Sequence, residues 1–196
     1  VLPMEQTQEN KMGTAPVLRL IVSMSLPAVF SMLVQSLYNI VDSYFVSKVS
    51  MDALTAVSLS FPIQQLIIAM AVGTGVGVNS LVSRRLGEKR RQEADKAASH
   101  GVVLAALTWL LFAVFGLFFA RPFIGLFTES SNVAALGGQY LSVVSLCSFS
   151  VFIEIALEKT LQATGNMIYP MQFMLVGCVT NLILDPILIF GLLGLP

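Results

Sequence analysis

Charged residues are scarce in this sequence, with 11 Lys and Arg and 11 Asp and Glu among 196 residues. This share of 11% is less than half of the roughly 25% that is typical of soluble domains. Hydrophobic residues make up 56%, and the mean hydropathy is +0.82. A soluble core of this size cannot hide so much apolar surface, which argues against a soluble enzyme. The net charge of zero also argues against a nucleic-acid-binding protein.

Cysteine and histidine are also rare, with two Cys and one His. Cys147 and Cys178 lie in long apolar segments and have no Cys or His at metal-ligand spacing, so neither a disulfide framework nor a zinc site is indicated. We interpret both as packing residues. His100 stands where a basic segment meets an apolar one, which favours an interfacial residue over a proton carrier.

Five long segments contain no charge, and each is long enough to cross a membrane as a helix. A hydrocarbon core about 30 Å thick requires about 20 helical residues, whereas barrel strands are only about ten residues long. The sequence therefore predicts an all-α polytopic membrane protein. Its five transmembrane helices are expected near residues 17–46, 53–82, 98–120, 134–156 and 168–193.

The two ends of the sequence indicate the domain boundaries, and the positions of Lys and Arg indicate the orientation in the membrane. Residues 1–16 are polar and acidic, so we expect a solvated tail before a single membrane domain over 17–196. The sequence starts with Val and stops directly after a predicted span, so we expect the natural chain to continue. Six basic residues lie between Arg84 and Lys96, and the positive-inside rule places this loop and the N-terminus in the cytosol. We favour a loop that sets topology over one that binds lipid or nucleic acid.

A glycine-rich run, Gly73-Thr-Gly-Val-Gly77, lies inside the second predicted helix. A nucleotide-binding glycine loop requires a strand before it and a helix after it, and neither is expected here. Gly73 and Gly77 have the four-residue spacing that allows two membrane helices to approach closely. We therefore interpret this run as a helix-packing feature.

Two carboxylic acids, Asp42 and Asp185, are flanked by apolar helix, where an ionised carboxylate costs at least about 2.5–3.5 kcal/mol. Gln35 and Tyr38 share a helix face with Asp42, and Asn181 shares one with Asp185. If the two faces meet, these groups would line one cavity that loads a proton or binds a sodium ion. The alternative is that Asp42 simply reaches the outer interface.

Three further residues stand out in the apolar segments. Pro27 and Pro186 each remove a backbone donor, so the helix there is either a hinge or a static kink. Glu154 lies deeper than Glu158 on the fourth predicted helix and could attract a cationic substrate.

Six segments in order resemble the multidrug and toxic compound extrusion (MATE) family, prokaryotic branch. They are residues 26–43 (LPAVFSMLVQSLYNIVDS), 56–64 (AVSLSFPIQ), 73–77 (GTGVG), 83–87 (SRRLG), 161–166 (LQATGN) and 181–186 (NLILDP). The resemblance implies a secondary antiporter of twelve helices in two six-helix lobes. Such a protein exports small cationic or amphipathic compounds in exchange for protons or sodium ions and needs no cofactor. This chain would supply five helices of the N-terminal lobe and would pair with a C-terminal lobe in the plasma membrane of a prokaryote.

The resemblance also implies roles for individual residues. Asp42 and Asp185 would be the ion-coupling carboxylates, with Tyr38 and Asn181 beside them. Asp42, Asn181 and Asp185 would form the sodium site if sodium is the coupling ion. Gln35, Asn39, Tyr140 and Glu154 would line the substrate cavity, although Glu154 stands where the family pattern leads us to expect a neutral polar residue. Pro27 would be where the first helix bends on protonation, with Pro186 as a second hinge.

Two other classes of membrane protein share some of these features. An intramembrane aspartyl protease also needs two acids on adjacent helices, but its second acid follows a Gly-x-Gly motif, whereas Asp185 follows Leu-Ile-Leu. A lipid-linked oligosaccharide flippase of the same superfamily would share the fold. It would require a basic cavity for its anionic cargo, whereas the charges found within these spans are acidic.

Overall fold

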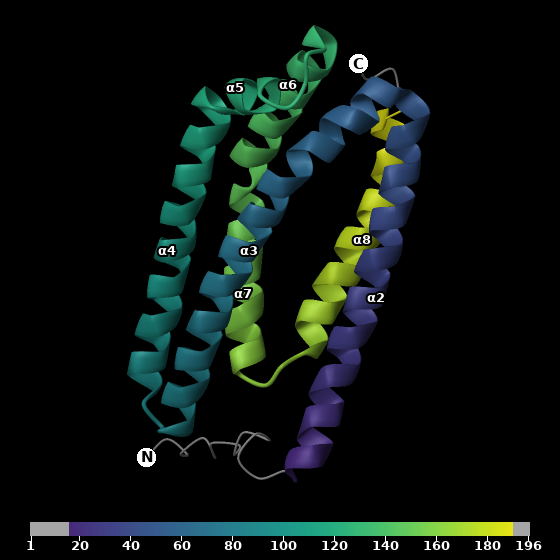
Figure 1. The fold of residues 1–196 in the computed structure, drawn as a ribbon. Coiled ribbons are helices and arrows are strands. Elements are labelled where there is room, and N and C mark those ends of the chain that lie inside the picture. Colours follow the sequence, from purple (N-terminus) through teal and green to yellow (C-terminus); the bar gives the residue numbers. More distant parts are fainter. Residues whose placement is uncertain (1–15, 190–196) are drawn as a thin grey trace.

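The computed structural model describes residues 16–189, except for the side chains of residues 46–49, 185, 186, 188 and 189. Over this range the regular elements are all helices, which confirms the all-α prediction (Figure 1). They are α2 (Val17–Val49), α3 (Met51–Gly87), α4 (Arg91–Phe118), α5 (Ala120–Gly125), α6 (Ser131–Cys147), α7 (Phe149–Ala163) and α8 (Ile168–Ile189).

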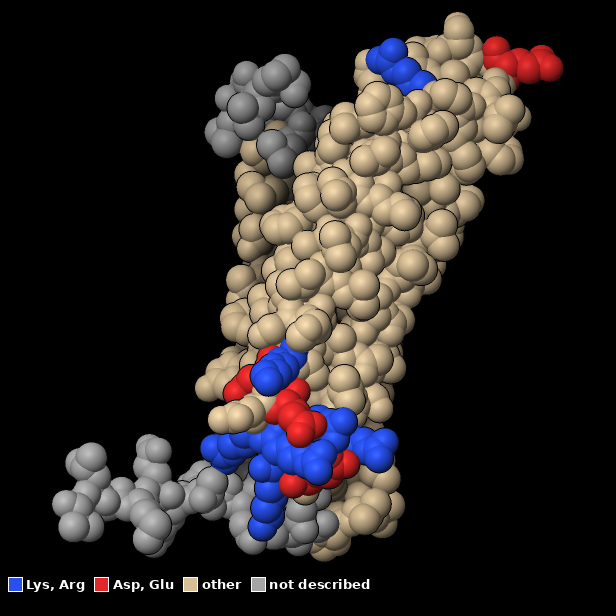
Figure 2. Space-filling view, turned by 90° about the vertical axis from the view of Figure 1, so that its left-hand side faces the viewer, with Lys and Arg blue, Asp and Glu red and all other residues tan. Residues whose placement is uncertain are grey.

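Four of these helical segments are long and apolar enough to cross a bilayer, and the described part of α8 adds a shorter apolar helix. The four are Val17–Phe45, Met51–Gly87, Arg91–Phe118 and the combined segment Ser131–Ala163. Figure 2 shows charged side chains gathered at the two ends of one face, with a broad uncharged band between them. Length, composition and charge distribution together identify a multi-pass membrane protein.

Several helices differ from the sequence prediction: α3 continues to Gly87 and α7 to Ala163, beyond the expected ends near residues 82 and 156. α4 begins at Arg91 and not near residue 98, because its charged first two turns extend beyond the apolar segment. The short α5 follows α4 almost directly and was not predicted. The predicted fourth helix is interrupted at Ser148, whose hydroxyl donates a hydrogen bond to the Ser145 carbonyl at 2.7 Å.

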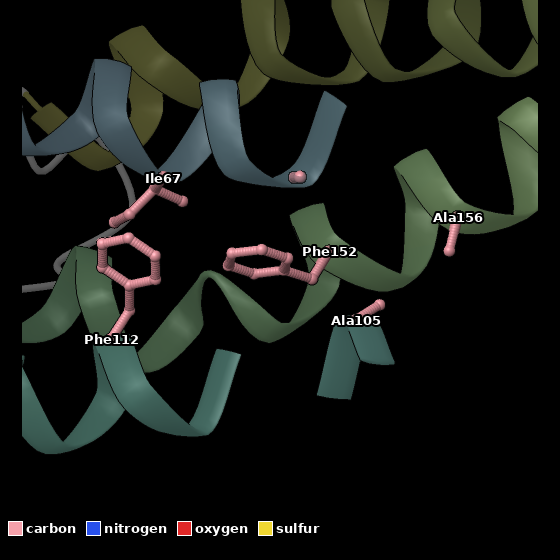
Figure 3. Packing of buried hydrophobic residues seen from close by; sticks show 6 residues of the cluster. Ile67, Ala105, Phe112, Phe152 and Ala156 are labelled. Carbon is pink, nitrogen blue, oxygen red and sulfur yellow. The ribbon is translucent and has the colours of Figure 1, made fainter. Parts of the chain in front are cut away.

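The tightly packed part of the molecule is a bundle of α3, α4, α6 and α7. At its centre the rings of Phe112 and Phe152 stack 5.9 Å apart, in a buried cluster with Ile67 and three alanines (Figure 3). Glycine permits close contact elsewhere: a Cβ at Gly116 would lie 2.5 Å from the Cβ of Ser145. Small residues at such contacts are what membrane helices use to pack without a hydrophobic driving force.

The second part is the pair of α2 and α8, which lie side by side (Figure 1). α2 buries little of its surface, and Ser31 is the one buried residue on it among those described. α3, which contains Pro62, curves so that its first half reaches α2 while its second half packs in the bundle (Figure 1). A proline inside a helix removes one backbone hydrogen bond, which accounts for such a bend.

Candidate transport cavity

A cavity of about 410 Å³ lies where the α2 and α8 pair faces α7 of the bundle. Its described lining comes from all three helices, with α8 contributing most of the wall. The lining residues are Gln35, Tyr38, Glu154, Met174, Gly177, Cys178, Thr180, Asn181 and Leu184. Four of the residues selected from the sequence therefore meet at one place, although they come from three separate segments of the chain.

Helix periodicity explains why these polar side chains converge. Gln35 and Tyr38 are three residues apart on α2, so both project from one face. Gly177 and Asn181 are four residues apart on α8 and line the same wall. Because α2 and α8 pack along each other, the two faces border a common space. Tyr38 and Asn181 are half-buried, while Gln35 is exposed.

Glu154, on α7, is the one acidic residue in the described lining of the cavity. One turn further along α7, Glu158 lies 3.3 Å from the ammonium group of Lys159 and accepts a hydrogen bond from Gln162. This pairing balances the charge of Glu158 and leaves Glu154 without an ion pair among the described residues. A carboxyl group in a cavity that has no basic residue in its described lining favours a cationic occupant.

Asp42 and Tyr140 lie outside this lining and form a second polar group with Gln64 of α3. The side-chain amide of Gln64 donates a hydrogen bond to the Tyr140 hydroxyl at 2.7 Å. The half-buried carboxyl group of Asp42 interacts electrostatically with the same tyrosine. Asn39 is exposed and does not line the cavity. Of the cavity residues expected on α2, Gln35 and Tyr38 therefore line this cavity, whereas Asn39 and Asp42 do not.

Asp185 and Pro186 fall within α8, one turn beyond Asn181, but their side chains lie outside the described part of the structure. Of the expected sodium ligands, Asn181 lines the cavity and Asp42 does not. The sodium site therefore stays a prediction. The backbone of α2 continues as a helix through Pro27, whose carbonyl accepts a hydrogen bond from the Ser31 hydroxyl at 2.9 Å.

Two interpretations from the sequence need correction. A Cβ placed at Gly73 or Gly77 would meet nothing within 4 Å among the described residues, so these glycines do not mediate the expected helix contact there. The close approach occurs at Gly75, where a Cβ would lie 2.8 Å from Lys159 Cγ on α7. Cys178, interpreted as a packing residue, is half-buried and lines the cavity.

Sequence reasoning also missed Gln64 and Thr180. Gln64 is an amide in the middle of an apolar segment, a signal that could have singled it out. Thr180 is chemically inconspicuous, because a threonine hydroxyl can bond within its own helix. Its place in the cavity wall emerges only from the packing of α2, α7 and α8.

Comparison with known proteins gives consistent matches. The chain is 29% identical to the FAD transporter of Shewanella oneidensis over 91% of its own length and 40% of that protein. It is 31% identical to the multidrug export protein MepA of Staphylococcus haemolyticus, over 86% of this chain and 37% of the relative. The structure of a MOP superfamily transporter from Pyrococcus furiosus superposes with a TM-score of 0.89 at 29% identity, covering 96% of this chain and 42% of the other.

The chain thus spans about 40% of the length of the relatives it matches. The model of the MatE family matches residues 27–187, which include all helices of the bundle and most of the α2 and α8 pair. The match covers well over half of the sequence and contains the whole described lining of the cavity. The chain therefore belongs to the MatE family, a family of membrane transporters and not of enzymes.

Proposed function

We propose that this chain is the N-terminal lobe of a secondary active antiporter in the plasma membrane of a prokaryote. The complete protein exports cationic or amphipathic compounds in exchange for protons or sodium ions. The observation that carries the proposal is the cavity between α2, α7 and α8, which combines amide, phenol and carboxyl groups with apolar wall residues. Pockets of this composition suit small amphipathic ligands.

The coupling mechanism rests on competition between ion and substrate. An ionised carboxylate in an apolar segment is costly, so proton or sodium binding at Asp42 and Asp185 lowers that cost. Once neutral, the acids no longer attract a cation, and the bound substrate loses affinity. Ion entry and substrate exit are then alternatives at one lobe, which is the requirement for antiport.

The second lobe belongs to the same proposal. The matched relatives are more than twice as long as the chain, which leaves room for a second lobe of similar size. A cavity that opens between α2 and the bundle would then face that lobe. In the proposed topology the N-terminus and the loop from Arg84 to Lys96 are cytosolic, as the distribution of Lys and Arg predicts.

The test is transport by the complete protein in lipid vesicles. Proton and sodium gradients are imposed separately, and efflux of a fluorescent cation is followed for wild type, Asp185→Asn and Asp42→Asn at matched amounts of folded protein. Asn mimics the protonated acid, so we expect Asp185→Asn to remove gradient-driven efflux and Asp42→Asn to weaken it. Ser43→Ala is the matched control, because Ser43 is exposed, adjoins Asp42 and already bonds the carbonyl of Asn39 within its own helix.

Wild-type efflux rates in Asp185→Asn under both gradients would contradict coupling through this lobe. Topology is tested separately with Lys89→Cys and Ser130→Cys in intact cells, where an impermeant thiol reagent should label only Ser130→Cys. Labelling of both would refute the proposed orientation.

The kind of cargo requires its own measurement. The described lining contains Glu154 and no basic residue, which supports cations over the anionic cargo of a lipid-linked oligosaccharide flippase. One relative is named a FAD transporter, and FAD carries phosphates. Uptake of FAD into the same vesicles, measured beside a cation, therefore decides between the two charge classes.

A further inference from the structure

A second cavity, of about 550 Å³, lies between α3 and α4 near the loop that joins them. It is separate from the transport cavity and shares none of its lining residues. On α3 the lining runs along one face from Gly73 to Arg85, which spans about 18 Å at 1.5 Å per residue. That length is close to half of a hydrocarbon core about 30 Å thick. The cavity is therefore a groove about one leaflet deep.

The groove is apolar at its inner end. Gly73 and Gly77 form its floor, and a Cβ at either would meet nothing within 4 Å among the described residues. Leu81 and Leu104 contribute apolar walls and are both exposed. α3 and α4 nevertheless stay in contact behind the groove, because a Cβ at Gly101 would lie 2.7 Å from a methyl group of Val78. The open floor is thus a consequence of the missing side chains and not of separated helices.

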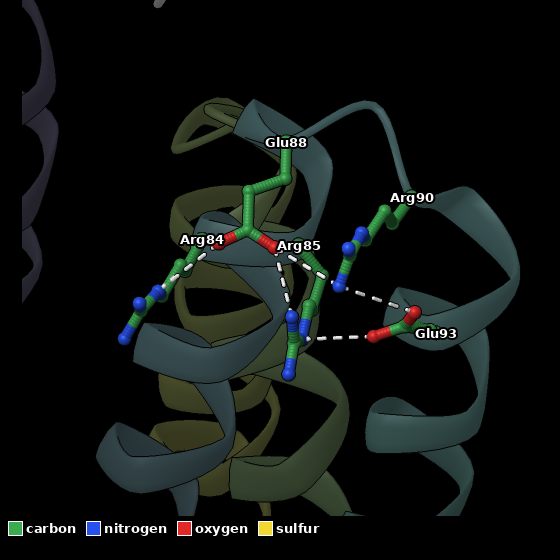
Figure 4. Close-up of polar contacts among 5 residues, drawn as sticks. All are labelled: Arg84, Arg85, Glu88, Arg90 and Glu93. Carbon is green, nitrogen blue, oxygen red and sulfur yellow. Dashed lines mark hydrogen bonds and ion pairs between the residues drawn. The ribbon is translucent and has the colours of Figure 1, made fainter.

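The loop end of the groove is polar and carries unpaired positive charge. Arg85 and Glu93 line it but are paired with each other at 3.2 Å, and Glu93 also lies 3.5 Å from Arg90. Figure 4 shows this network, in which Glu88 joins Arg84, Arg85 and Arg90. Glu93, the carboxylate in the described lining, is therefore already paired with arginine, as is Glu88 in the adjoining loop.

Lys96 and His100 complete the mouth, one turn apart on α4, and both are exposed. Lys96 makes no ion pair with any described residue. The Nδ1 atom of His100 lies 2.6 Å from the Lys96 carbonyl, which accepts its hydrogen bond, so Nε2 is an acceptor in the neutral ring and would donate to an anionic ligand in the imidazolium form. Between Arg84 and Lys96 the six basic residues exceed the three acidic ones, Glu88, Glu93 and Asp95, so the surrounding field is positive.

We propose that this groove binds an anionic phospholipid, with its phosphate at Lys96 and His100 and an acyl chain along the Gly73 and Gly77 floor. The groove has the same polarity gradient as the lipid and runs in the same direction, from a charged interface to an apolar interior. Basic pockets between membrane helices on the cytosolic side attract anionic headgroups, at about 1 kcal/mol for each basic side chain near the surface. A free phosphate would use only the mouth and would leave the glycine floor empty.

The test uses the complete protein in nanodiscs made of equal parts of phosphatidylglycerol and phosphatidylcholine. One lipid at a time carries a photoreactive acyl chain, and labelled peptides are identified by mass spectrometry. We expect phosphatidylglycerol to label α3 and α4 at the groove more strongly than phosphatidylcholine. Lys96→Gln with His100→Gln should reduce labelling about fivefold or more, the equivalent of about 1 kcal/mol.

Matched controls separate the site from general charge. Lys89→Gln with Arg91→Gln removes more positive charge from the same loop but alters no lining residue, and should leave labelling of the groove unchanged. Gly77→Leu fills the floor, where a Cβ would meet nothing within 4 Å among the described residues, and should reduce labelling as strongly as the charge substitutions. Excess inorganic phosphate should not compete, because it lacks the acyl chain. Each variant is first checked for the wild-type melting temperature.

Three results would overturn the proposal. Equal labelling by the two lipids would remove the role of headgroup charge, and competition by inorganic phosphate would reduce the site to an anion site. Photocrosslinking from a reactive residue at position 77 to polypeptide, and not to lipid, would assign the groove to a contact between lobes. Transport activity enters none of these readouts, so the result is independent of the proposed antiport.

Discussion

The bundle of α3, α4, α6 and α7 and the pair of α2 and α8 are built differently although both consist of apolar helices. In the bundle, helices approach through glycine and alanine, and Phe152 and Leu141 are 1% and 0% exposed. α2 is the opposite case, since Ser31 is the one buried residue on it among those described, and it is 8% exposed. Two of its polar residues, Gln35 and Tyr38, line the cavity where the pair meets the bundle. The comparison shows that the bundle buries apolar side chains within itself, whereas the α2 and α8 pair contributes most of the wall of the cavity that lies between the two regions.

The largest effect on stability is expected in the core of the bundle. Phe152→Ala removes the ring that stacks on Phe112 and should lower the free energy of unfolding by about 3 kcal/mol. We expect the low end of the usual range because the unfolded helices still lie in lipid and not in water. The control is Phe173→Ala on α8, where the side chain is 63% exposed and the loss should stay below about 1 kcal/mol. Equal losses in detergent unfolding experiments would erase the distinction between the two regions.

A smaller effect is expected from glycines in the same two regions. Gly116→Ala places a methyl group 2.5 Å from Ser145 Cβ, close to the backbone of α6, and should cost about 2 kcal/mol by overpacking. Gly177→Ala on α8 meets nothing within 4 Å and should be neutral or slightly stabilising, because alanine favours helix. Thermal midpoints of the two variants provide the measurement. A greater loss for Gly177→Ala would mean that α8 is the more tightly packed helix.

A smaller effect again is expected at the cavity between the bundle and the α2 and α8 pair. Glu154→Gln removes the carboxyl group that faces the pair and should weaken binding of a cationic compound about fivefold, since one charge at about 4 Å in water contributes about 1 kcal/mol. Glu158→Gln is the matched control, because Glu158 is paired with Lys159 and does not line the cavity. Equilibrium binding of a cation and of a neutral compound of similar size distinguishes charge from shape. Equal weakening for both compounds would argue against an electrostatic role.

The smallest effect is expected at the loop that joins α3 and α4. The hydrogen bond from Arg85 lowers the pKa of Glu88 below its ordinary value of 4.5, and the charge of Arg84 acts in the same direction. A carboxyl group whose pKa is lower in the folded state stabilises that state above its unfolded pKa. This stabilisation is lost as the pH falls through the folded pKa. Glu88→Gln should therefore melt slightly below wild type at neutral pH and equally with it at strongly acidic pH. A difference that grows on acidification would have the wrong sign.

Much of the fold could be predicted because charge and apolar length leave few alternatives within a membrane. Five uncharged segments located the spans, and the periodicity of Gln35, Tyr38 and Asn181 selected residues that do share a cavity. The start of α4 was missed because Glu93 and Asp95 suggest a loop, whereas a helix can extend into the charged interface. Charge marks the end of the apolar segment and not the end of the helix.

The remaining differences from the prediction concern contacts between helices. They have one physical origin, because the sequence of a single helix does not determine which other helix packs against it. Gly73, Gly75 and Gly77 look alike in the sequence, yet only Gly75 meets α7. Asp42 lies one turn beyond Tyr38, and that turn carries it out of the cavity and toward Tyr140. Both outcomes depend on where a distant helix packs, information that local spacing does not contain.

The pairing of α2 with α8 also has a consequence for how the protein is made. α8 begins 119 residues after α2 ends, so the ribosome must synthesise three further membrane crossings before the partner of α2 exists. At about 5–20 residues per second, this interval lasts roughly 6–24 seconds. During that time α2 has no partner on the flank that α8 will cover, and its apolar surface must be solvated by lipid alone. A mean hydropathy of 2.0 in its most apolar stretch suits α2 to a lipid environment during that interval, and among the described helices α2 is synthesised longest before its main partner.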